Sequence, residues 1–355
     1  MKLFELLSSH GHERLAFHHD AATGLRAIIA IHSTALGNAL GGTRRWAYSD
    51  EAEAIRDVLR LSEGMTYKAA AADLPMGGAK SVILATAGNP ATEAEARAMG
   101  RFVETFRGTY IAAEDVGVTP QFVDWMAAET EHVMGGDSVS HGGDPSPFTA
   151  QGCFNAMGAC LQNLGKPVNF SRLTVVVQGV GATGSRVAKL CQQAGATVLV
   201  TDTNVANLQR VVKELGVGVV DGDVFSTPCD ILAPCALGGV LNQQTIPKLR
   251  CGIVCGTANN QLLDPIEDGA NIKKAGVLYA PDFIVNAGGL IRLAGLYIGL
   301  SEQQINEKIR HIESTTAVVL RDAQNMPSAY EAGVAYAKSR IDRGRSNKKA
   351  TMTPA

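Results

Sequence analysis

A glycine-rich turn between a strand and a helix is the feature that most limits the folds open to this chain. Leu173–Gln178 is a short apolar, β-branched run, and Gly179–Gly184 follows it at once as Gly-Val-Gly-Ala-Thr-Gly. A second apolar run, Ala196–Thr201, ends in Asp202. Glycine-rich turns are common, so the motif alone would be weak. Strand, glycine turn, helix, strand and acid in this order are typical of a βαβ unit that binds a dinucleotide.

Each glycine of this turn has its own physical task. Gly179 permits the sharp turn, and Gly181 lets a pyrophosphate meet backbone N–H groups at the N-terminus of a helix expected to start near Ser185. Gly184 allows that helix to pack close to the strand. Asp202 would accept hydrogen bonds from the adenosine ribose and repel a 2′-phosphate, which predicts NAD rather than NADP. The remaining predicted cofactor contacts of the turn are Val180, Ala182 and Thr183.

Three further strand-like runs extend this pattern towards the C-terminus. They are Asp230–Ala233, Gly252–Cys255 and Val277–Ala280. Runs of this kind that alternate with helices predict an α/β fold with a doubly wound parallel sheet. The loops at residues 234–239 and 257–261 follow two of these strands. Ligands bind at the carboxyl ends of strands in such sheets, so both loops are candidates for cofactor contact.

Two lysines bracket a small-residue turn in the first part of the chain. Lys68 closes a helical segment over residues 51–72, and Lys80 opens the strand-like run Ser81–Leu84. Two ammonium groups held near each other repel, so one can lose its proton near neutral pH while the other holds an anion. The pair suits a general base beside a carboxylate clamp. The alternative is that both lysines are solvated ends of ordinary elements.

Glycines and acids nearby offer further candidates. Gly41 and Gly42 lie in the turn-rich stretch Leu36–Arg44, where a close backbone approach and a simple tight turn explain them equally well. An apolar strand runs straight into Glu114 and Asp115. Acids at the end of a strand are often only loop residues, so these two need other evidence.

Cap residues predict where two helices begin. Asp50 or Ser49 is expected to cap the first long helix. Thr119 followed by Pro120 predicts a helix that runs through Glu131, because proline suits the first helical turn.

Length and composition favour a folded enzyme of two domains. A chain of 355 residues is longer than one core usually supports. The Gly/Pro-rich stretch 135–147 is the best linker. We therefore predict a substrate and subunit-contact domain over residues 1–140, joined by a C-terminal helix at about 328–355, and a nucleotide domain over 141–327. The net charge of −2 gives no electrostatic reason to expect nucleic acid or an anionic membrane.

The seven cysteines are scattered through apolar runs without a paired framework, which indicates reduced thiols. Cys251 and Cys255 are four residues apart but have no histidine cluster near them, so we predict no metal site. The first residues are too soon interrupted by charge for a signal peptide, and no run reaches membrane-spanning length. These features predict a cytoplasmic protein.

Ordered motifs across nearly the whole chain resemble the glutamate/leucine/phenylalanine/valine amino-acid dehydrogenases, and within that family the leucine dehydrogenases most. Many matches in one order are a specific signal. The motifs are residues 40–44, 64–68, 77–80, 113–117, 145–150, 233–238 and 286–289.

The resemblance implies a homo-oligomeric enzyme for NAD-dependent oxidative deamination of an L-amino acid to a 2-oxo acid and ammonia, and for the reverse reductive amination. It implies that Lys68 binds the substrate carboxylate, that Lys80 activates water, and that Asp115 shuttles protons. Asn259 would contact the substrate near the nicotinamide, and Thr149 would lie close to the cofactor. The resemblance also adds Gly41, Gly42, Met65 and Glu114 as substrate contacts, and Cys235, Ala236, Ala258 and Asn286 as cofactor contacts.

The same resemblance implies a side-chain pocket built from Leu40, Ala113, Leu290 and Leu293. All four are apolar, and Leu40 replaces the lysine with which a glutamate dehydrogenase binds the distal carboxylate. Glutamate would bury an unpaired charge, so we predict leucine, isoleucine or valine first and phenylalanine second. Plain core packing is the alternative for these residues. Ala79 stands where the family usually has a third glycine.

Two other functions fit parts of the pattern. A cofactor-binding regulatory protein could retain the fold without catalysis, but it would be expected to have lost a lysine or Asp115. Another NAD enzyme, such as a hydroxy-acid or imine oxidoreductase, would have no use for ammonia.

Overall fold

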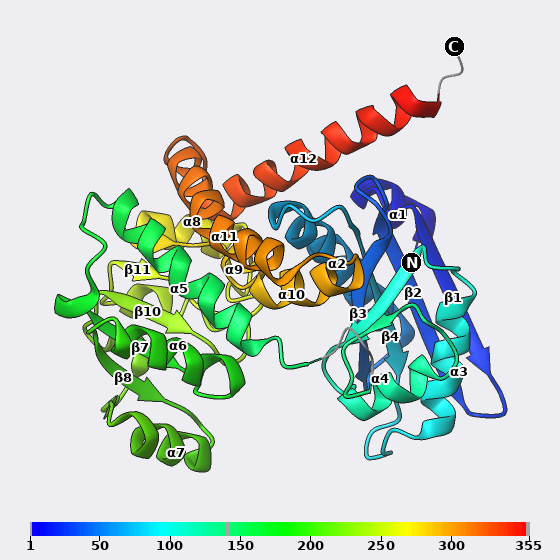
Figure 1. The fold of residues 1–355 in the computed structure, drawn as a ribbon, viewed down its shortest axis with the longest axis horizontal. Coiled ribbons are helices and arrows are strands. Elements are labelled where there is room, and N and C mark those ends of the chain that lie inside the picture. The colour runs from blue at the N-terminus through cyan, green and yellow to red at the C-terminus, as the bar shows by residue number, and fades with distance from the viewer. Residues whose placement is uncertain (1, 139–142, 353–355) are drawn as a thin grey trace. The chain divides into compact units, whose positions relative to one another are not determined.

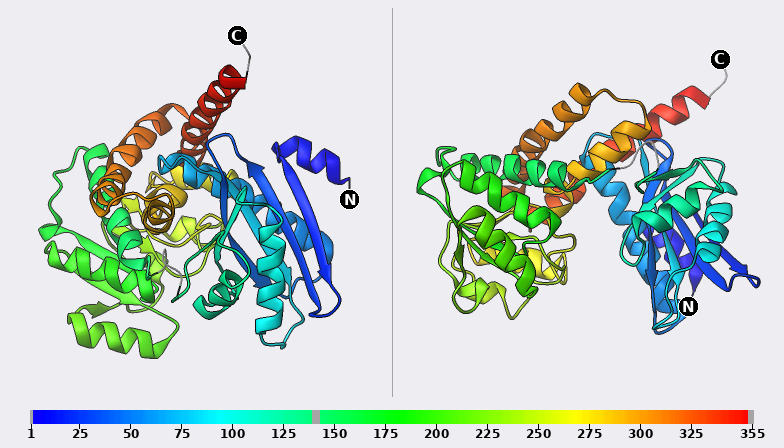
Figure 2. Two further views of the ribbon diagram at one scale, coloured as in Figure 1. Left: turned by 45° about the vertical axis from the view of Figure 1, so that its right-hand side comes forward. Right: turned by 60° about the horizontal axis from the view of Figure 1, so that its bottom comes forward.

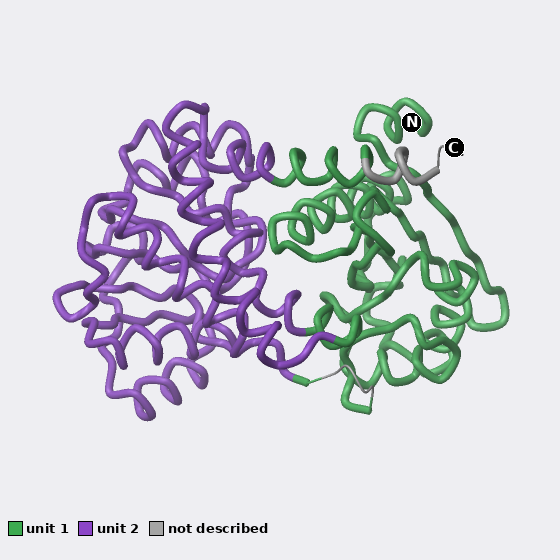
Figure 3. Tube along the Cα trace, turned by 45° about the horizontal axis from the view of Figure 1, so that its top comes forward, with its two compact units in different colours: residues 1–143, 293–299, 337–355 green, residues 144–292, 300–336 purple. Residues whose placement is uncertain are grey.

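The computed structural model describes residues 2–138 and 143–352, with side chains through residue 346. The chain divides into two compact units (Figure 3). Unit 1 comprises residues 1–143, 293–299 and 337–355, and unit 2 comprises residues 144–292 and 300–336. Part of the predicted linker, residues 139–142, lies outside the described residues.

Unit 1 is built on a mixed sheet in the order β1-β2-β4-β3-β5-β6 (Figure 1). β1 and β4 pair antiparallel with β2, whereas β4, β3, β5 and β6 run parallel. The strands are β1 (Arg14–Asp20), β2 (Leu25–Ser33), β3 (Ala39–Trp46), β4 (Gly77–Leu84), β5 (Tyr110–Glu114) and β6 (Val133–Met134). The helices that lie wholly in this unit are α1 (Leu3–His10), α2 (Glu51–Ala71), α3 (Glu93–Glu104) and α4 (Pro120–Ala127).

Both faces of this sheet are buried, and β2 shows why. Its residues alternate between two cores, because successive side chains of a strand point to opposite faces. Ile29 and Ile31 join the core beneath α3 and α4, whereas Ile28 and Ala30 join the core beneath α2. Figure 2 shows α2 and the pair α3 and α4 on opposite faces of the sheet. The sheet is therefore held between helices, as a central strand without polar alternation requires.

Several boundaries in unit 1 differ from the prediction. The stretch expected to be a turn around Gly41 and Gly42 is strand β3, and β4 begins four residues before Ser81. The predicted helix through Glu131 ends at Ala127. Pairing with neighbouring strands overrides the turn propensity of glycine, and local sequence does not reveal such pairing.

The predicted helix caps are confirmed. The Asp50 carboxylate accepts a hydrogen bond from the backbone N–H of Glu53, 2.7 Å away, so Asp50 rather than Ser49 is the N-cap of α2. Thr119 caps α4 in the same way, with Pro120 in the first turn.

Unit 2 is built on a parallel sheet in the order β12-β11-β10-β7-β8-β9. The strands are β7 (Thr174–Gln178), β8 (Thr197–Thr201), β9 (Gly218–Val219), β10 (Ile231–Pro234), β11 (Ile253–Val254) and β12 (Leu278–Tyr279). The helices are α5 (Ser146–Asn163), α6 (Ala182–Gln193), α7 (Val205–Leu215), α8 (Glu267–Lys274), α9 (Asp282–Val285) and α11 (Glu302–Asp322). Two helices, α10 (Gly288–Tyr297) and α12 (Ala329–Met352), begin in unit 2 and end in unit 1. Short 3-10 helices lie at Phe170–Arg172, Val224–Ser226, Ile246–Lys248 and Ala323–Asn325.

The predicted α/β fold class, with a doubly wound second domain, is confirmed. The inner residues of β7, β8 and β10 are valine, leucine, isoleucine and alanine, which is typical of a parallel sheet with helices on both faces. Helix α6 begins at Ala182, three residues earlier than expected, so Gly184, the last glycine of the turn, is already helical.

The cysteines, possible metal ligands and longer helices of the described residues can also be stated. All seven cysteines are free thiols. Among the described residues, no cluster of three histidine, cysteine or acidic side chains has the geometry to hold a metal ion. Within the same residues, no helix combines the length and apolar character needed to cross a membrane.

Candidate active site

The most unusual pair in unit 1 is a buried lysine bound to an aspartate. Lys80 lies on β4 and Asp115 directly follows β5, and Lys80 Nζ is 2.9 Å from Asp115 Oδ2. Lys80 is only 4% exposed. Burial lowers the pKa of Lys80 even though Asp115 favours its charged form. A lysine with a lowered pKa can act as a general base, which is the role that the sequence predicted.

A second cation, Arg44 on β3, binds the same carboxylate. Its Nε is 2.9 Å from Asp115 Oδ2, and its Nη1 is 3.0 Å from Asp57 Oδ2 on α2. Although burial opposes ionisation of Asp115, Lys80 and Arg44 together hold its pKa below the usual value. Arg44 also lowers the pKa of Lys80. Burial is thus the largest cause and Arg44 adds to it, whereas the repulsion by Lys68 that was expected from the sequence stays a prediction.

Arg44 is not among the functional residues predicted from the sequence. It is the last residue of the motif at residues 40–44, so the motif did contain it. The side chain of Arg44 could be placed beside Asp115 only once β3 and β5 were known to be neighbours, since 71 residues separate the two positions.

Buried hydroxyl groups tie together the three strands that carry this site. Tyr110 on β5 donates to the carbonyl of Gly41 at 2.8 Å, and its hydroxyl lies 2.9 Å from Ser81 Oγ on β4. Ser81 in turn donates to Thr43 on β3 at 2.8 Å. All of these side chains are buried, so the network fixes the register of the strands beside Lys80.

Glycines bring these strands and helix α2 close together. A Cβ on Gly41 would collide with the carbonyl oxygen of Ala79, and one on Gly42 would lie 2.6 Å from the carbonyl oxygen of Glu114. A Cβ on Gly78 would collide with Thr66 on α2. The open question from the sequence is thereby decided: Gly41 and Gly42 serve close backbone approach and not a tight turn.

Lys68 lies in the last turn of α2, two residues beyond Thr66, and is half-buried. The end of this helix is fixed by Arg340 of α12, which donates to the carbonyl of Ala70 at 2.9 Å and pairs with Asp73 at 2.9 Å. A cation at a helix C-terminus is favourable because the last carbonyl groups carry partial negative charge. The elements that carry Lys68 and Lys80 are thus in direct contact, whereas their predicted roles stay predictions.

The glycine turn of unit 2 has the form that a dinucleotide requires. A Cβ on Gly179 would lie 2.6 Å from that of Ala236, and one on Gly184 would collide with the backbone of Gly179. A Cβ on Gly181 meets no atom within 4 Å. Gly181 is also the N-cap of α6, and no side chain caps this end of the helix. Backbone N–H groups at such an end attract a phosphate, so the turn fits the pyrophosphate of a dinucleotide.

Asp202 lies at the end of β8 beside this turn. Its Oδ2 accepts a hydrogen bond from the backbone N–H of Val180 at 2.7 Å, and its Oδ1 accepts one from Asn204 at 2.8 Å. These bonds hold the carboxylate next to the turn, as the prediction of a ribose-binding acid requires.

Comparison with known proteins shows the same two parts. The family model for the Glu/Leu/Phe/Val dehydrogenase dimerisation domain matches residues 12–132, and the model for Glutamate/Leucine/Phenylalanine/Valine dehydrogenase matches residues 201–348. The chain belongs to this dehydrogenase family. It is therefore an amino-acid dehydrogenase, an oxidoreductase that acts on CH–NH2 donors, and its family uses NAD(P).

Several relatives of this Glu/Leu/Phe/Val dehydrogenase are similar over most of their length. The leucine dehydrogenase of Geobacillus stearothermophilus is 42% identical over 348 residues, which cover 96% of this chain and 94% of that protein. The phenylalanine dehydrogenase of Lysinibacillus sphaericus is 42% identical over 319 residues, covering 88% and 84% of the two chains. The crystal structure of L-tryptophan dehydrogenase from Nostoc punctiforme is similar with a TM-score of 0.86, 36% identity, and coverage of 97% and 99%.

The remaining predicted cofactor residues of this dehydrogenase lie in unit 2, Thr149 on α5 and the others outside regular helices and strands. Asn286 donates to Asn259 Oδ1 at 2.7 Å and to the carbonyl of Thr257 at 3.2 Å, whereas its own buried Oδ1 has no hydrogen-bond partner in the described chain. Such an orphaned acceptor fits a donor supplied by a ligand, for example the nicotinamide carboxamide. Cys235 directly follows β10, Ala258 lies in the loop after β11, and Thr149 contacts Gly289.

The predicted substrate-pocket residues of this dehydrogenase are divided between the units. Leu40 on β3 is fully buried, and Ala113 on β5 is half-buried. Leu290 and Leu293 are both half-buried on α10, but Leu290 belongs to unit 2 and Leu293 to unit 1. Met65 and Glu114 are half-buried in unit 1. Their roles as substrate contacts stay predictions.

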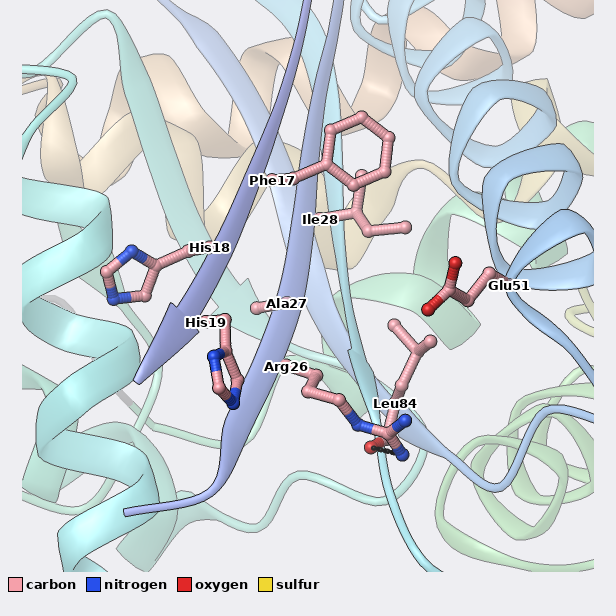
Figure 4. A pocket seen from close by; sticks show the side chains of 8 residues that line it. All are labelled: Phe17, His18, His19, Arg26, Ala27, Ile28, Glu51 and Leu84. Atoms are coloured by element: carbon pink, nitrogen blue, oxygen red, sulfur yellow. Dashed lines mark hydrogen bonds between the residues drawn. The ribbon is translucent and has the colours of Figure 1, made fainter. Parts of the chain in front are cut away.

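A pocket of about 380 Å³ lies on the α2 face of the mixed sheet, away from these residues (Figure 4). It is bounded by Phe17, Arg26 and Leu84 from the strands and by Glu51 from the start of α2. The predicted catalytic residues do not line it, so it has no part in the site described above.

Proposed function

We propose that this enzyme catalyses NAD-dependent oxidative deamination of a hydrophobic L-amino acid to its 2-oxo acid and ammonia, and the reverse reductive amination. Leucine, isoleucine and valine are the first substrates. The observation that carries the proposal is the buried pair of Lys80 and Asp115, in a chain of this family. A silent cofactor-binding protein would have no need of a desolvated lysine, because an unused buried charge costs stability.

The residues divide the chemistry between them. When held at the glycine turn and Asp202, NAD would supply the acceptor for the hydride of the substrate α-carbon, and loss of this hydride turns the amino acid into an iminium ion. Lys68 holds the substrate carboxylate so that the α-hydrogen has one orientation. Neutral Lys80 takes a proton from the water that attacks the iminium carbon. Water attack gives a carbinolamine and protonated Lys80, which passes its proton through Asp115 to the carbinolamine nitrogen. The C–N bond then breaks and ammonia leaves, while neutral Lys80 accepts the hydroxyl proton as the carbonyl group of the 2-oxo acid forms.

The lowered pKa of Lys80 sets the pH dependence of this scheme. Burial moves the pKa of Lys80 down from its ordinary value, so the neutral amine forms at lower pH than for an exposed lysine. Oxidative deamination should therefore increase as pH rises through the pKa of Lys80. Reductive amination needs protonated Lys80, so its rate should be higher at lower pH.

Two features support the cofactor and the assembly. Asp202 beside the glycine turn favours an unphosphorylated ribose, because its charge repels a 2′-phosphate, and this supports NAD over NADP. The match of residues 12–132 to a dimerisation domain supports a homo-oligomer. One further feature concerns the substrate. Leu40 is apolar and fully buried, so it offers no charge to the distal carboxylate of glutamate, which supports a hydrophobic substrate side chain.

An aromatic amino acid is the second candidate substrate. The relatives include a phenylalanine dehydrogenase at 42% identity and an L-tryptophan dehydrogenase at 36% identity. Hydrophobic pockets separate substrates that differ by one methylene by only about 1–3 kcal/mol, so the ranking must be measured.

Initial rates with NAD decide between these candidates. The panel is leucine, isoleucine, valine, phenylalanine, tryptophan and glutamate, and we expect the highest kcat/KM for the branched aliphatic residues. NADH oxidation with 4-methyl-2-oxopentanoate, with and without ammonium, is the companion assay. Turnover without ammonium would instead indicate a hydroxy-acid type of oxidoreductase. NAD binding without turnover of any substrate would indicate a regulatory protein.

A further inference from the structure

Arg44 stands out because it connects the two proposed catalytic groups of unit 1 to a helix. Its guanidinium binds Asp115 through Nε at 2.9 Å and Asp57 through Nη1 at 3.0 Å. The side chain is one-fifth exposed, so both pairs are partly shielded from water. A planar guanidinium can serve two carboxylates at once, whereas an ammonium offers no such fork.

Asp57 is itself fixed on α2. Its Oδ2 accepts a hydrogen bond from Tyr48 at 2.8 Å, and its Oδ1 accepts one from Arg60 at 3.0 Å. Only 14% of the Asp57 side chain is exposed. Arg44 is therefore oriented from the helix side before it contacts Asp115, and charges of alternating sign run from Lys80 to Arg60.

We propose that Arg44 is a positioning residue for catalysis, which holds the Asp115 carboxylate against Lys80 and ties this pair to the helix that carries Lys68. The inference rests on the proposed function, because it takes Lys80 and Asp115 as the groups that transfer protons. It goes further, since it assigns the geometry and ionisation of those groups to a residue outside the predicted catalytic and substrate-binding set.

The charge of Arg44 acts on both groups in the same direction. It lowers the pKa of Asp115, and it also lowers the pKa of Lys80, which it repels. The other ionisable groups near the pair are Asp57, which favours the charged form of Lys80, and the tyrosines Tyr48 and Tyr110.

Removal of the Arg44 charge therefore has a predictable sign. Asp115 loses one of its two cations, so its pKa rises. Lys80 loses a repelling neighbour, so its pKa rises as well.

The matched control is the next residue on the same strand. Arg45 also pairs with a carboxylate, since its Nε is 2.9 Å from Glu95 Oε2, and its side chain is 12% exposed. Because successive strand residues point to opposite faces, Arg45 lies on the other face of the sheet from Arg44. Arg45→Gln thus removes a comparable ion pair without touching Lys80 or Asp115.

The experiment measures kcat/KM and kcat for leucine oxidation with NAD from pH 6 to 11 in the full-length enzyme. For Arg44→Gln we expect the acid limb of the profile to move up by about one pH unit, and kcat to fall by at least tenfold at neutral pH. Arg44→Lys restores the charge but not the fork, so its acid limb should return towards the wild-type position while kcat stays low. Arg45→Gln should keep the wild-type profile and show at most a lower melting temperature.

Each other outcome overturns the proposal. An Arg44→Gln enzyme with wild-type limbs and kcat would show that Asp115 does not need Arg44. The same shift in Arg45→Gln, or no difference between the Arg44→Lys and Arg44→Gln profiles, would reduce Arg44 to a structural residue. If Arg44→Gln does not fold, Arg44→Lys against Arg45→Gln still makes the test. Asp115→Asn separates the two levels: full activity there contradicts the proposed function, whereas inactivity with an unshifted Arg44→Gln profile contradicts only this inference.

Discussion

The two units of this dehydrogenase prepare for ligands by opposite means. Unit 1 buries full charges: Lys80, Asp115, Arg44 and Asp57 form a connected series of ion pairs among strands and a helix. Unit 2 offers backbone instead, with uncapped N–H groups after the glycine turn and a single acid, Asp202. Buried charges can be tuned in pKa and suit proton transfer, whereas backbone donors cannot titrate and suit holding a phosphate.

Glycines also differ in what they leave room for. At Gly41 in unit 1, and at Gly184 in unit 2, a Cβ would collide with the backbone of a neighbouring residue, so glycine permits close packing there. In unit 2, Gly181 faces open space on the Cβ side, so it leaves room for a ligand. Glycine is thus needed for packing at Gly41, whereas at Gly181 no packing contact requires it and its predicted role is to bind the cofactor.

Loss of Lys80 should have the largest effect on catalysis. We expect Lys80→Ala to lower kcat for leucine oxidation by about 10²–10⁴-fold, the range of general acid–base catalysis, with a much smaller change in KM. Steady-state kinetics measure both. Lys274→Ala, an exposed lysine of α8, is the control and should behave as wild type. A large loss of binding with retained turnover would mean that Lys80 is a second carboxylate anchor.

Alanine at the two contrasted glycines should separate stability from binding. Gly41→Ala forces a methyl group into the backbone of β4, which should lower the free energy of unfolding by about 1–3 kcal/mol or more. Gly181→Ala has space and an ordinary backbone angle of φ −69°, so its melting temperature should stay near wild type. Its KM for NAD should rise about tenfold or more, equivalent to about 1.4 kcal/mol.

Thermal melting and NAD titration of both variants check this contrast. A stable Gly41→Ala would show that the strands can separate without cost. A destabilised Gly181→Ala with normal NAD affinity would remove the turn from the binding site.

Asp202→Asn should change cofactor choice more than affinity. Asparagine can still accept the hydrogen bond from Val180, so the turn should keep its conformation. Without the negative charge, the preference for NAD over NADP should fall by roughly tenfold, because repulsion of the 2′-phosphate is lost. The ratio of kcat/KM for the two cofactors measures this. An unchanged ratio would mean that another group excludes NADP.

The smallest expected effect concerns the acid stability of unit 1, through two buried histidines. Burial lowers the pKa of His12 to about 4 and also lowers the pKa of His32, against which it packs with ring centroids 4.8 Å apart. The unfolded chain binds protons near pH 6.5, whereas the folded chain keeps these rings neutral. Stability from them is therefore complete above about pH 6.5 and is lost as pH falls towards 4.

Melting temperatures between pH 7 and 4.5 test this, with His12→Gln as the variant. The decline with acid should be shallower in His12→Gln than in the wild type. His311→Gln, at an exposed position of α11, should retain the wild-type slope. Equal slopes in all three proteins would show that the buried histidines do not limit acid stability.

The sequence was informative where a function or a fold needs particular residues at fixed local spacing. The turn from Gly179 to Gly184, the caps at Asp50 and Thr119, and the acid at Asp202 all follow from contacts within a few residues or one βαβ unit. The resemblance motifs added the family, which the comparisons bear out. Boundaries set by distant partners were less successful, and β3 was mistaken for a turn because its glycines were read without their neighbours.

The sequence by itself determined the α/β class, the family and the chemical identity of the candidate groups, because periodicity and motif spacing are local properties of the chain. Only the tertiary structure decided that Arg44 binds Asp115, that Lys80 is buried, and that Gly41 serves strand contact rather than a turn. These facts depend on parallel pairing between strands far apart in sequence. That pairing decides which charged groups lie beside Lys80 and Asp115, and those neighbours shift the two pKa values.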